Sequence, residues 1–165
     1  MKGNFWITHD LLESYGACSA GKAAFKEEYP DGGEYQSILD NCCQHNKSDW
    51  AAWLLGRVGA TEDERIYEEP VNDASLEIVF AGKISFKFGA VITGINAGWG
   101  INAGAGIKAG AGINAGAGIN AGEGWGIFAG LSVRVSDWEC AATVIAKTKP
   151  ENLISGYWCG GEDNA

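Results

Sequence analysis

The residue types that most often carry chemistry are sparse in this 165-residue chain, and the tightest group of them is Cys42, Cys43 and His45. Zinc fingers separate their paired cysteines by about two to four residues, and no second Cys or His pair follows at that spacing. The five cysteines are odd in number and irregularly spaced, which favours reduced thiols over a disulfide framework. The sequence therefore predicts buried or inert thiols on a helix, with no metal and no cofactor.

A nucleophilic enzyme site is not indicated either. A Ser or Cys nucleophile needs a base held by an orienting acid, and only His9 and His45 offer an imidazole. Both fall near predicted helix ends, and a pairing of a cysteine and a histidine with Asp40 or Asp49 has no further support. With 21 acidic residues some carboxylate pair always lies close, so glycoside cleavage stays open. We expect a protein that is not an enzyme.

The elements that would position these side chains are short helices in residues 1–60. Capping residues and helix breakers predict four of them: 9–15 after Thr8, one from Ser19 to before Pro30, 34–44, and one from Ser48 to Gly59. The last two carry apolar residues at the spacing of a core-facing stripe, namely Tyr35, Ile38 and Leu39, then Trp50, Trp53, Leu54 and Leu55. The charged segment 61–70, TEDERIYEEP, is expected to form an exposed link.

A hexad repeat follows and is the most specific signal in the chain. Isoleucine recurs every six residues at Ile95, Ile101, Ile107, Ile113 and Ile119. Ile127 comes eight residues later, which marks Gly124 and Trp125 as an insertion. An alanine follows each isoleucine by two, so Ile and Ala face one side of an extended segment while the Asn or Lys between them faces the other.

This pattern predicts a β-solenoid of stacked coils. Recurrent glycines would let the chain turn with positive φ at each corner. Two hexads per coil would make a flat solenoid and three a triangular one; we favour two. Flanking strands are expected to cap the stack at 75–80, 83–88, 131–135, 140–146 and 153–158, with a turn at 136–138.

The fold class is therefore α+β, with a helical subdomain and acidic linker at 1–70 and a β-solenoid with flanking strands at 71–165. The net charge of −9 argues against nucleic acid as a direct partner, because phosphate binding needs a basic face. No run of about 18 apolar residues indicates a membrane span. The opening MKGNFWITHDLLES lacks the apolar core of a signal peptide, so we expect a cytoplasmic protein.

A resemblance adds a biological setting. The hexads GINAGWGINAGAGIKAG resemble Gly/Ala-rich hexapeptide-repeat proteins of phages and prophages, including W-G interruptions at 99–100 and 125–126. Residues 17–32, ACSAGKAAFKEEYPDG, are similar to a small helical module of phage proteins. The resemblance implies a phage or prophage origin, and small acidic proteins of that origin often inhibit host defence, as anti-CRISPR proteins do. This last step is an analogy from size, charge and origin.

We therefore expect a non-enzymatic inhibitor that binds a Cas effector or another defence nuclease. Its exposed carboxylates would occupy the positions that nucleic-acid phosphates normally take in a basic channel of the target. Alternatively, these acids only belong to solvated faces of helices. The acidic face would comprise Glu27, Glu28, Asp31, Glu34, Glu62, Asp63, Glu64, Glu68 and Glu69. A solenoid face would comprise Asn96, Asn102, Lys108, Asn114, Asn120, Trp99 and Trp125. Alternatively, the outward Asn and Lys side chains form a solvent-facing ladder that only stabilises the stack.

The alternative is a structural or ligand-binding solenoid, such as a virion-associated, surface-binding or ice-binding protein. Ice binders of this build would more naturally show threonine ladders, and the hexads contain no threonine. A homodimer formed through stacked ends or edges stays open.

Overall fold

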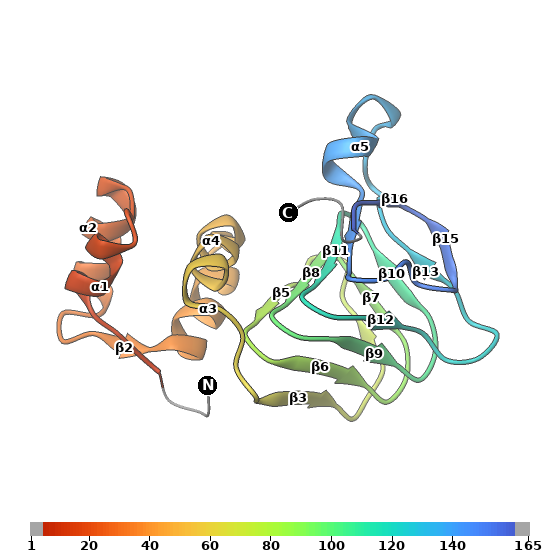
Figure 1. Cartoon of the computed structure of the whole chain (residues 1–165), viewed down its shortest axis with the longest axis horizontal. Helices are drawn as coiled ribbons and strands as arrows, with labels where there is room; N and C mark the ends of the chain where they lie inside the picture. The colour runs from red at the N-terminus through yellow and green to blue at the C-terminus, as the bar shows by residue number, and fades with distance from the viewer. Residues whose placement is uncertain (1–4, 161–165) are drawn as a thin grey trace.

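The computed structural model of the chain describes residues 5–160, which form a helical part followed by a parallel β-solenoid (Figure 1). The helices of the first part lie between residues 9 and 58, and the strands of the solenoid between 64 and 158. The predicted α+β class with a β-helix is thus confirmed. No helix among residues 5–160 is long and apolar enough to cross a membrane.

The helical part contains four helices and a two-stranded ribbon. The helices are α1 (His9–Ser14), α2 (Ser19–Glu28), α3 (Tyr35–Gln44) and α4 (Ser48–Val58), and β1 (Trp6–Ile7) pairs antiparallel with β2 (Gly33–Glu34). Thr8 caps α1 as predicted, accepting from the Leu11 N–H at 3.2 Å. Cys18 rather than Ser19 caps α2, because its Sγ accepts from the Gly21 N–H at 3.4 Å.

The inward stripe predicted for α3 is confirmed, whereas that for α4 is only half right. Tyr35, Ile38 and Leu39 are buried. On α4, Leu54 is buried but Trp50, Trp53 and Leu55 are only partly covered. The two tryptophans were expected in the core; they instead face a gap between the two helix pairs, as described below.

The solenoid has three parallel sheets, one along each side of a triangular prism. The first sheet contains β3 (Glu64–Tyr67), β6 (Lys83–Phe86), β9 (Ile101–Ala103) and β12 (Ile119–Asn120). The second contains β4 (Val71–Asn72), β7 (Ala90–Ile92), β10 (Ile107–Ala109), β13 (Ile127–Phe128) and β15 (Leu153–Ser155). The third contains β5 (Glu77–Phe80), β8 (Gly94–Ala97), β11 (Ile113–Ala115), β14 (Thr143–Ile145) and β16 (Tyr157–Trp158).

Each coil uses three hexads, so the preference for two was wrong. Ile95 stands in register with Ile113, and Ile101 with Ile119, a separation of 18 residues. Three inward rows of Ile and Ala meet around one axis and cover one another, and Ile95, Ile101, Ile107 and Ile113 are fully buried. The predicted insertion at 124–125 is confirmed by the pairing of Ile107 with Ile127.

The corner glycines of the hexads serve close approach rather than positive φ, which corrects the expected reason for their presence. None of Gly98, Gly104, Gly116 and Gly122 has a positive φ. A Cβ at Gly98 would overlap the Ala81 carbonyl of the preceding coil, and one at Gly116 would overlap the Gly98 carbonyl. Only glycine lets successive corners stack this closely.

The solenoid begins earlier than predicted. Residues 61–70 were expected to be an exposed link, yet β3 lies within them and pairs with β6. The Tyr67 ring stacks on Phe86, with centroids 4.9 Å apart, and Arg65 stands in register with the buried Ile84. Tyr67 and Arg65 thus occupy the inward side of β3, and their contacts allow this charged segment to form the first strand of the stack.

The C-terminal coils also depart from the predicted strands. Residues 131–135 form no strand; the chain leaves the prism between β13 and β14 through a 3-10 turn at Val135–Asp137 and the short helix α5 (Trp138–Ala141). Leu131 and Val135 are exposed, so nothing there buries the alternating side chains that suggested a strand. The single final strand predicted at 153–158 is in fact two, because the chain turns a corner at Gly156, so that β15 joins the second sheet and β16 the third.

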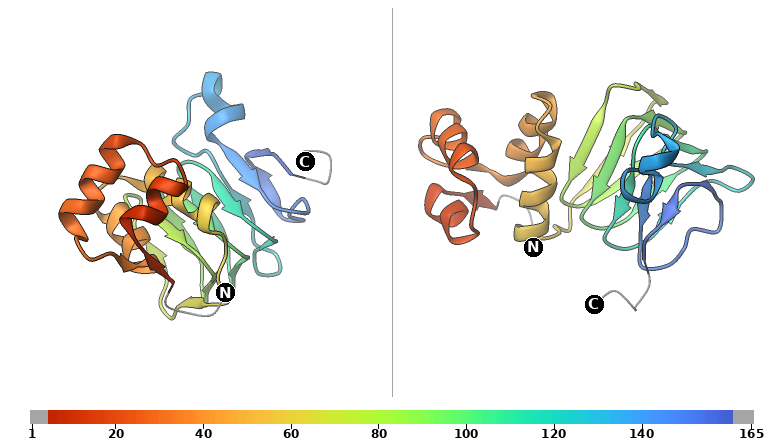
Figure 2. Two further views of the ribbon diagram at one scale, coloured as in Figure 1. Left: turned by 60° about the vertical axis from the view of Figure 1, so that its left-hand side comes forward. Right: turned by 90° about the horizontal axis from the view of Figure 1, so that it is seen from above.

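The helical part is fixed to the solenoid through α3 and α4. In Figure 2 this helix pair lies between the α1–α2 pair and the third sheet. Val79 of β5 is buried against the helices, and Gln36 bonds its strand twice, donating to the Val79 carbonyl at 3.1 Å and accepting from the Ala81 N–H at 2.9 Å.

Candidate functional site

The predicted chemical cluster lies at the end of α3. Cys42 and Cys43 are half-buried on the helix, and His45 follows it with Nδ1 3.0 Å from the Asn41 carbonyl oxygen. Burial raises the pKa of the Cys43 thiol to about 11 and raises that of Cys42 as well. Both thiols therefore stay protonated near neutral pH, which makes them poor nucleophiles and poor metal ligands. Among residues 5–160 no group of three His, Cys, Asp or Glu side chains is placed to hold a metal.

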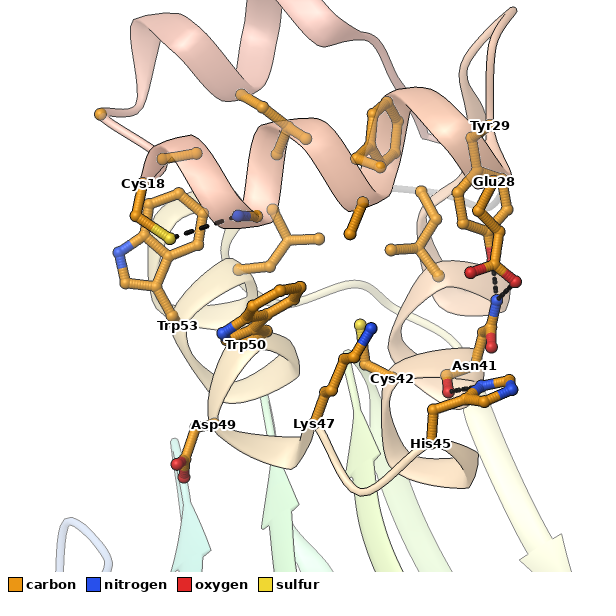
Figure 3. A pocket seen from close by; sticks show the side chains of 18 residues that line it. Cys18, Glu28, Tyr29, Asn41, Cys42, His45, Lys47, Asp49, Trp50 and Trp53 are labelled. Atoms are coloured by element: carbon orange, nitrogen blue, oxygen red, sulfur yellow. Dashed lines mark hydrogen bonds between the residues drawn. The ribbon is translucent and has the colours of Figure 1, made fainter.

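A groove lies beside this cluster, between the α1–α2 pair and the α3–α4 pair (Figure 3). It encloses about 430 Å³ and is lined mainly by apolar atoms. Its size falls in the range of about 300–1,000 Å³ that is typical of ligand sites. We call it the interhelical groove.

Three helices each turn one face toward the interhelical groove. The spacing of three, four or seven residues within each set places its members on a single helical face. The lining residues that these helices contribute are Gly21, Ala24, Phe25 and Glu28 of α2, Ile38, Asn41 and Cys42 of α3, and Asp49, Trp50, Trp53 and Leu54 of α4. Phe25, Ile38 and Leu54 of these faces are buried in one core cluster, so the groove is the part of the contact between the helix pairs that stays open.

The two walls differ in character. On the α2 side, Gly21 has no side chain and Ala24 has a small one, so little side-chain volume projects into the groove at these two positions. The α4 wall is aromatic, and Figure 3 shows Trp50 and Trp53 extending from α4 toward α2. Both tryptophans are partly exposed.

Polar groups gather at one end of the interhelical groove. The Asn41 amide donates to Glu28 Oε1 and to the Tyr29 hydroxyl, each at 2.6 Å. Lys47 Nζ lies 4.9 Å from the centre of the Trp50 ring and forms no ion pair within residues 5–160. An apolar centre with a polar margin is the usual anatomy of a binding site.

The predicted acidic residues do not form one continuous face. Glu27, Glu28, Asp31 and Glu34 lie between the end of α2 and the end of β2, whereas Glu62, Asp63, Glu64, Glu68 and Glu69 lie just before, in or just after β3, the first strand of the solenoid. Several carboxylates are already engaged. Glu34 caps α3 by accepting from the Ser37 N–H at 2.7 Å, and Glu68 pairs with Lys87. The Ser85 hydroxyl and Lys83, at 2.6 and 3.0 Å, lower the pKa of Glu64.

Five of these acids are exposed and have no side-chain partner elsewhere in residues 5–160. They are Glu27, Asp31, Glu62, Asp63 and Glu69. They remain available to a partner, but in two separate groups.

The predicted solenoid face is likewise divided, because the prism has three sides. Asn96 and Asn114 stand on the third sheet and are joined at 2.7 Å, while Asn102 and Asn120 stand on the first sheet and are joined at 3.0 Å. These contacts support the ladder role. Lys108 projects from the second sheet, 5.9 Å from the Phe128 ring.

Trp99 and Trp125 lie at two different corners of the prism, and each is more than half exposed. Trp99 lies between the third and first sheets, and Trp125 between the first and second. The tryptophans and the asparagine ladders therefore present several small surfaces rather than one.

Sequence reasoning missed the interhelical groove. A weak signal was present in Gly21 and Ala24, two small residues on a face of α2 that also carries Phe25. The Trp50 and Trp53 pair gave no further help, because core and groove tryptophans share the same helical spacing.

Comparisons with known proteins bear on the helical part. Residues 1–59 match the family model of the YdhT N-terminal domain, a region that contains α1 to α4 and the interhelical groove. No curated protein matches the chain. No solved structure matches it either. The helical part of this chain is therefore similar to a described domain family.

Proposed function

We propose that this chain is a non-enzymatic inhibitor, encoded by a phage or prophage, that acts in the cytoplasm of the host cell. Its proposed target is a Cas effector complex, whose nucleic-acid binding or nuclease activity it would block, so that it would act as an anti-CRISPR. The phage setting rests on the resemblance of the hexads and of residues 17–32 to phage proteins.

The observation that carries a binding role is the interhelical groove. Partly exposed tryptophans beside an apolar hollow are typical of protein interfaces, where Trp, Tyr and Arg supply most of the binding energy. The Arg65–Asp40 pair and Gln36 hold this part firmly on the solenoid. A bound inhibitor would thus add a rigid body to its target.

The unpaired acids offer a second contact. Glu62 and Asp63 precede β3, and Glu27 and Asp31 flank the end of α2. Carboxylates at these points would favour association with a basic channel and speed the encounter at low salt. Because the acids form two groups, we assign them steering rather than close mimicry of a phosphate backbone.

The non-enzymatic part of the proposal is supported by the state of the nucleophile candidates. The pKa values of Cys42 and Cys43 are raised, which is the opposite of what an activated thiol requires. His45 Nδ1 is occupied by the Asn41 carbonyl rather than by an orienting acid.

A structural role is the second candidate, favoured by the exposed apolar residues of the solenoid. Phe88, Trp125 and Ile154 are each at least half exposed around the second sheet. Such side chains suit attachment to a virion component or another extended surface. This role predicts association with phage particles and no effect on host defence.

The proposal is tested by expressing the chain in bacterial strains that carry defined CRISPR or other defence systems. The expected result is restored plaque formation by a targeted phage in one of these strains, together with recovery of its Cas complex on the tagged chain. Glu62→Lys with Asp63→Lys should make that recovery weaker at low salt. Normal defence in every strain, with recovery of virion proteins only, would overturn the inhibitor and favour the structural role.

A further inference from the structure

We propose that one corner of the solenoid, between the first and second sheets, binds an uncharged glycan. One sugar ring would occupy a polar pocket near the C-terminal end of the stack, and the following rings would stack on the exposed side chains of Trp125 and Phe88. This inference goes beyond the proposed inhibition of a defence complex and does not depend on it. It rests on the pocket, on the row of side chains along the corner, and on the charges around both.

The pocket lies where the first sheet lacks a fifth strand. The second and third sheets each contain five strands, whereas the first ends at β12. In the last coil, residues 147–152 pass over β12 without forming a strand, and among them Pro150 has no N–H to contribute to a ladder. The space left between β12 and these residues encloses about 280 Å³. We call it the corner pocket.

A buried backbone donor lines the corner pocket. In the coils below, Ile84 donates its N–H to the Gly100 carbonyl at 2.9 Å, and Ile101 donates to the Gly118 carbonyl at 3.0 Å. Ile119 continues this row, pairs with Ile101 and is 2 % exposed. Its N–H has no such acceptor in the coil above within residues 5–160. A buried N–H without a partner costs free energy, so a ligand oxygen at this point would be stabilised.

The side chains around the corner pocket are polar and of mixed type. Those of Asn120, Thr148 and Asn152 can each donate and accept hydrogen bonds. Lys149 and Glu151 add one charge of each sign, so the pocket favours neither an anion nor a cation. The hydroxyl groups of a sugar also donate and accept, and thus match this set. The volume is just below the range of about 300–1,000 Å³ that holds drug-sized ligands, which suits a single ring.

Exposed aromatic side chains continue the site along the corner. Phe88, Ala105 and Trp125 each lie two residues before a member of one paired row of β7, β10 and β13, so they occupy the same corner in successive coils. Phe88 is 50 % exposed and Trp125 is 56 % exposed. Trp125 belongs to the connection between Ala121 and Ile127, and both of these residues line the corner pocket. The aromatic row therefore begins beside the pocket.

The spacing along this row matches a sugar chain. Successive coils stand about 4.8 Å apart, so Phe88 and Trp125 are separated by about 9.6 Å along the stack. In an extended β-1,4-linked glycan each ring advances the chain by nearly one coil. Alternate rings would then meet the two aromatic side chains, and the ring between them would pass over Ala105, which is too small to obstruct it. The C–H groups of a sugar ring suit the negative face of an aromatic ring.

Charge and extent favour this ligand over other classes. Glu123 and Glu151 are exposed at the corner of a chain whose net charge is −9, which disfavours an anionic polysaccharide. Lys108 of the adjacent second sheet offsets only part of this charge. Even with the exposed Ile154 beside it, the aromatic row is a narrow strip, whereas a standard protein interface buries about 800 Å² on each partner.

Affinity electrophoresis of the full chain tests the ligand class. The native gels contain an uncharged β-1,4-linked glycan (hydroxyethyl cellulose, arabinoxylan or glucomannan), the anionic carboxymethyl cellulose, or dextran, whose α-1,6 linkages do not give an extended chain. We expect slower migration with at least one of the uncharged β-1,4-linked glycans, weaker retardation with carboxymethyl cellulose, and none with dextran. Retardation by none of the uncharged β-1,4-linked glycans, or equal retardation by dextran, would overturn the inference.

Two tryptophan variants locate the site. Trp125→Ala removes an aromatic side chain from the row, whereas Trp99→Ala removes one of similar exposure, 52 %, from a different corner. Trp125→Ala should weaken binding of the retained glycan by at least about tenfold, and Trp99→Ala should leave it unchanged. Equal affinities in the two variants would overturn the assignment. A dimer that forms without glycan and that Trp125→Ala abolishes would also overturn it, because a second copy would then cover the row.

Two asparagine variants test the corner pocket separately. Asn152→Ala removes an amide from the pocket, whereas Asn72→Ala makes the same change on β4, at the other end of the second sheet. Only Asn152→Ala should reduce the affinity for the retained glycan, and thermal melts identify any loss that comes from unfolding. Oligosaccharides of that glycan should bind more tightly as they lengthen to four rings, one for the pocket and three for the row. Equal affinities in folded Asn152→Ala and Asn72→Ala would remove the pocket from the site and overturn the inference.

Discussion

Arg65 of the first coil donates two hydrogen bonds to Asp40 of α3, at 3.0 and 2.7 Å, and so joins the solenoid to the helical part. The same guanidinium lies 4.5 Å from the centre of the Phe80 ring. A bidentate pair with aromatic stacking is a geometry that lysine cannot reproduce. The charged segment before the repeat thus serves as a joint between the two parts.

Removing this joint should destabilise the protein. Asp40→Asn keeps the shape but removes the charge opposite Arg65, and because the pair is about one-third exposed we expect a loss of about 1–2 kcal/mol. Urea denaturation measures it. Glu13→Gln is the matched control, because it breaks an exposed ion pair with Lys22 and should cost clearly less than Asp40→Asn. Equal losses of unfolding free energy in the two variants would show that the Arg65–Asp40 pair contributes no more than an exposed ion pair.

Inward isoleucines should be intolerant of polar substitution. Ile113 is fully buried, so Ile113→Asn loses an apolar side chain and leaves an amide without partners, at a cost of about 2–4 kcal/mol. Ile154→Asn makes the same change at a position that is 66 % exposed and should cost less than about 0.5 kcal/mol. Thermal melts of both variants decide this, and a parent-like melt for Ile113→Asn would contradict the inward assignment.

At the corner glycines, even the addition of one methyl group should lower the stability of the protein. Gly98→Ala would place a Cβ against the Ala81 carbonyl, so the two coils must separate and the variant should lose stability. Gly56→Ala, in an open part of α4, should gain up to about 1 kcal/mol from better helix propensity. Opposite signs for these two chemically identical changes are the expected result in chemical denaturation. A shared sign would remove the close-approach explanation.

The half-buried thiols predict a pH dependence at alkaline pH. The pKa of Cys43 is raised from 9.0 to about 11, so the folded chain keeps a proton that the unfolded chain loses in this interval. The unfolding free energy should therefore fall as the pH rises from about 9 to about 11. Cys43→Ala should reduce this slope, while Cys140→Ala, at an exposed site, should retain it.

Thiol alkylation offers an independent check of the same environment. Iodoacetamide near the ordinary thiol pKa of about 8.5 should modify the exposed Cys18 and Cys140 before Cys43. Peptide mass mapping over time gives the order. Rapid modification of Cys43 in the folded protein would contradict the raised pKa.

Local signals explain which parts of this fold could be predicted. The helices were marked by caps and breakers such as Thr8 and Pro30, and the strands by the alternation of Ile and Ala. The number of hexads in a coil could not be read from a period of six, because two or three corners satisfy the same pattern. It depends on the contact of Ile95 with Ile113, which is a property of the closed prism.

The candidate site was less accessible to prediction for a related reason. The groove lies where the α1–α2 pair and the α3–α4 pair meet, and no residue within a single helix encodes how the two pairs pack. Sequence could not show that Glu64 was already engaged by Lys83 and Ser85 of the next coil. Partners distant in sequence decide which surface groups remain free.

The 18-residue register has a consequence for the gene as well as for the protein. Removal or duplication of three whole hexads would restore the same neighbours above and below, and the corner glycines would stack as before. Recombination within the part of the gene that encodes these hexads, in steps of 18 codons, would therefore lengthen or shorten the solenoid by one coil, about 4.8 Å, without a frameshift. The distance between the helical part and the C-terminal coils can then change during evolution in discrete steps of one coil.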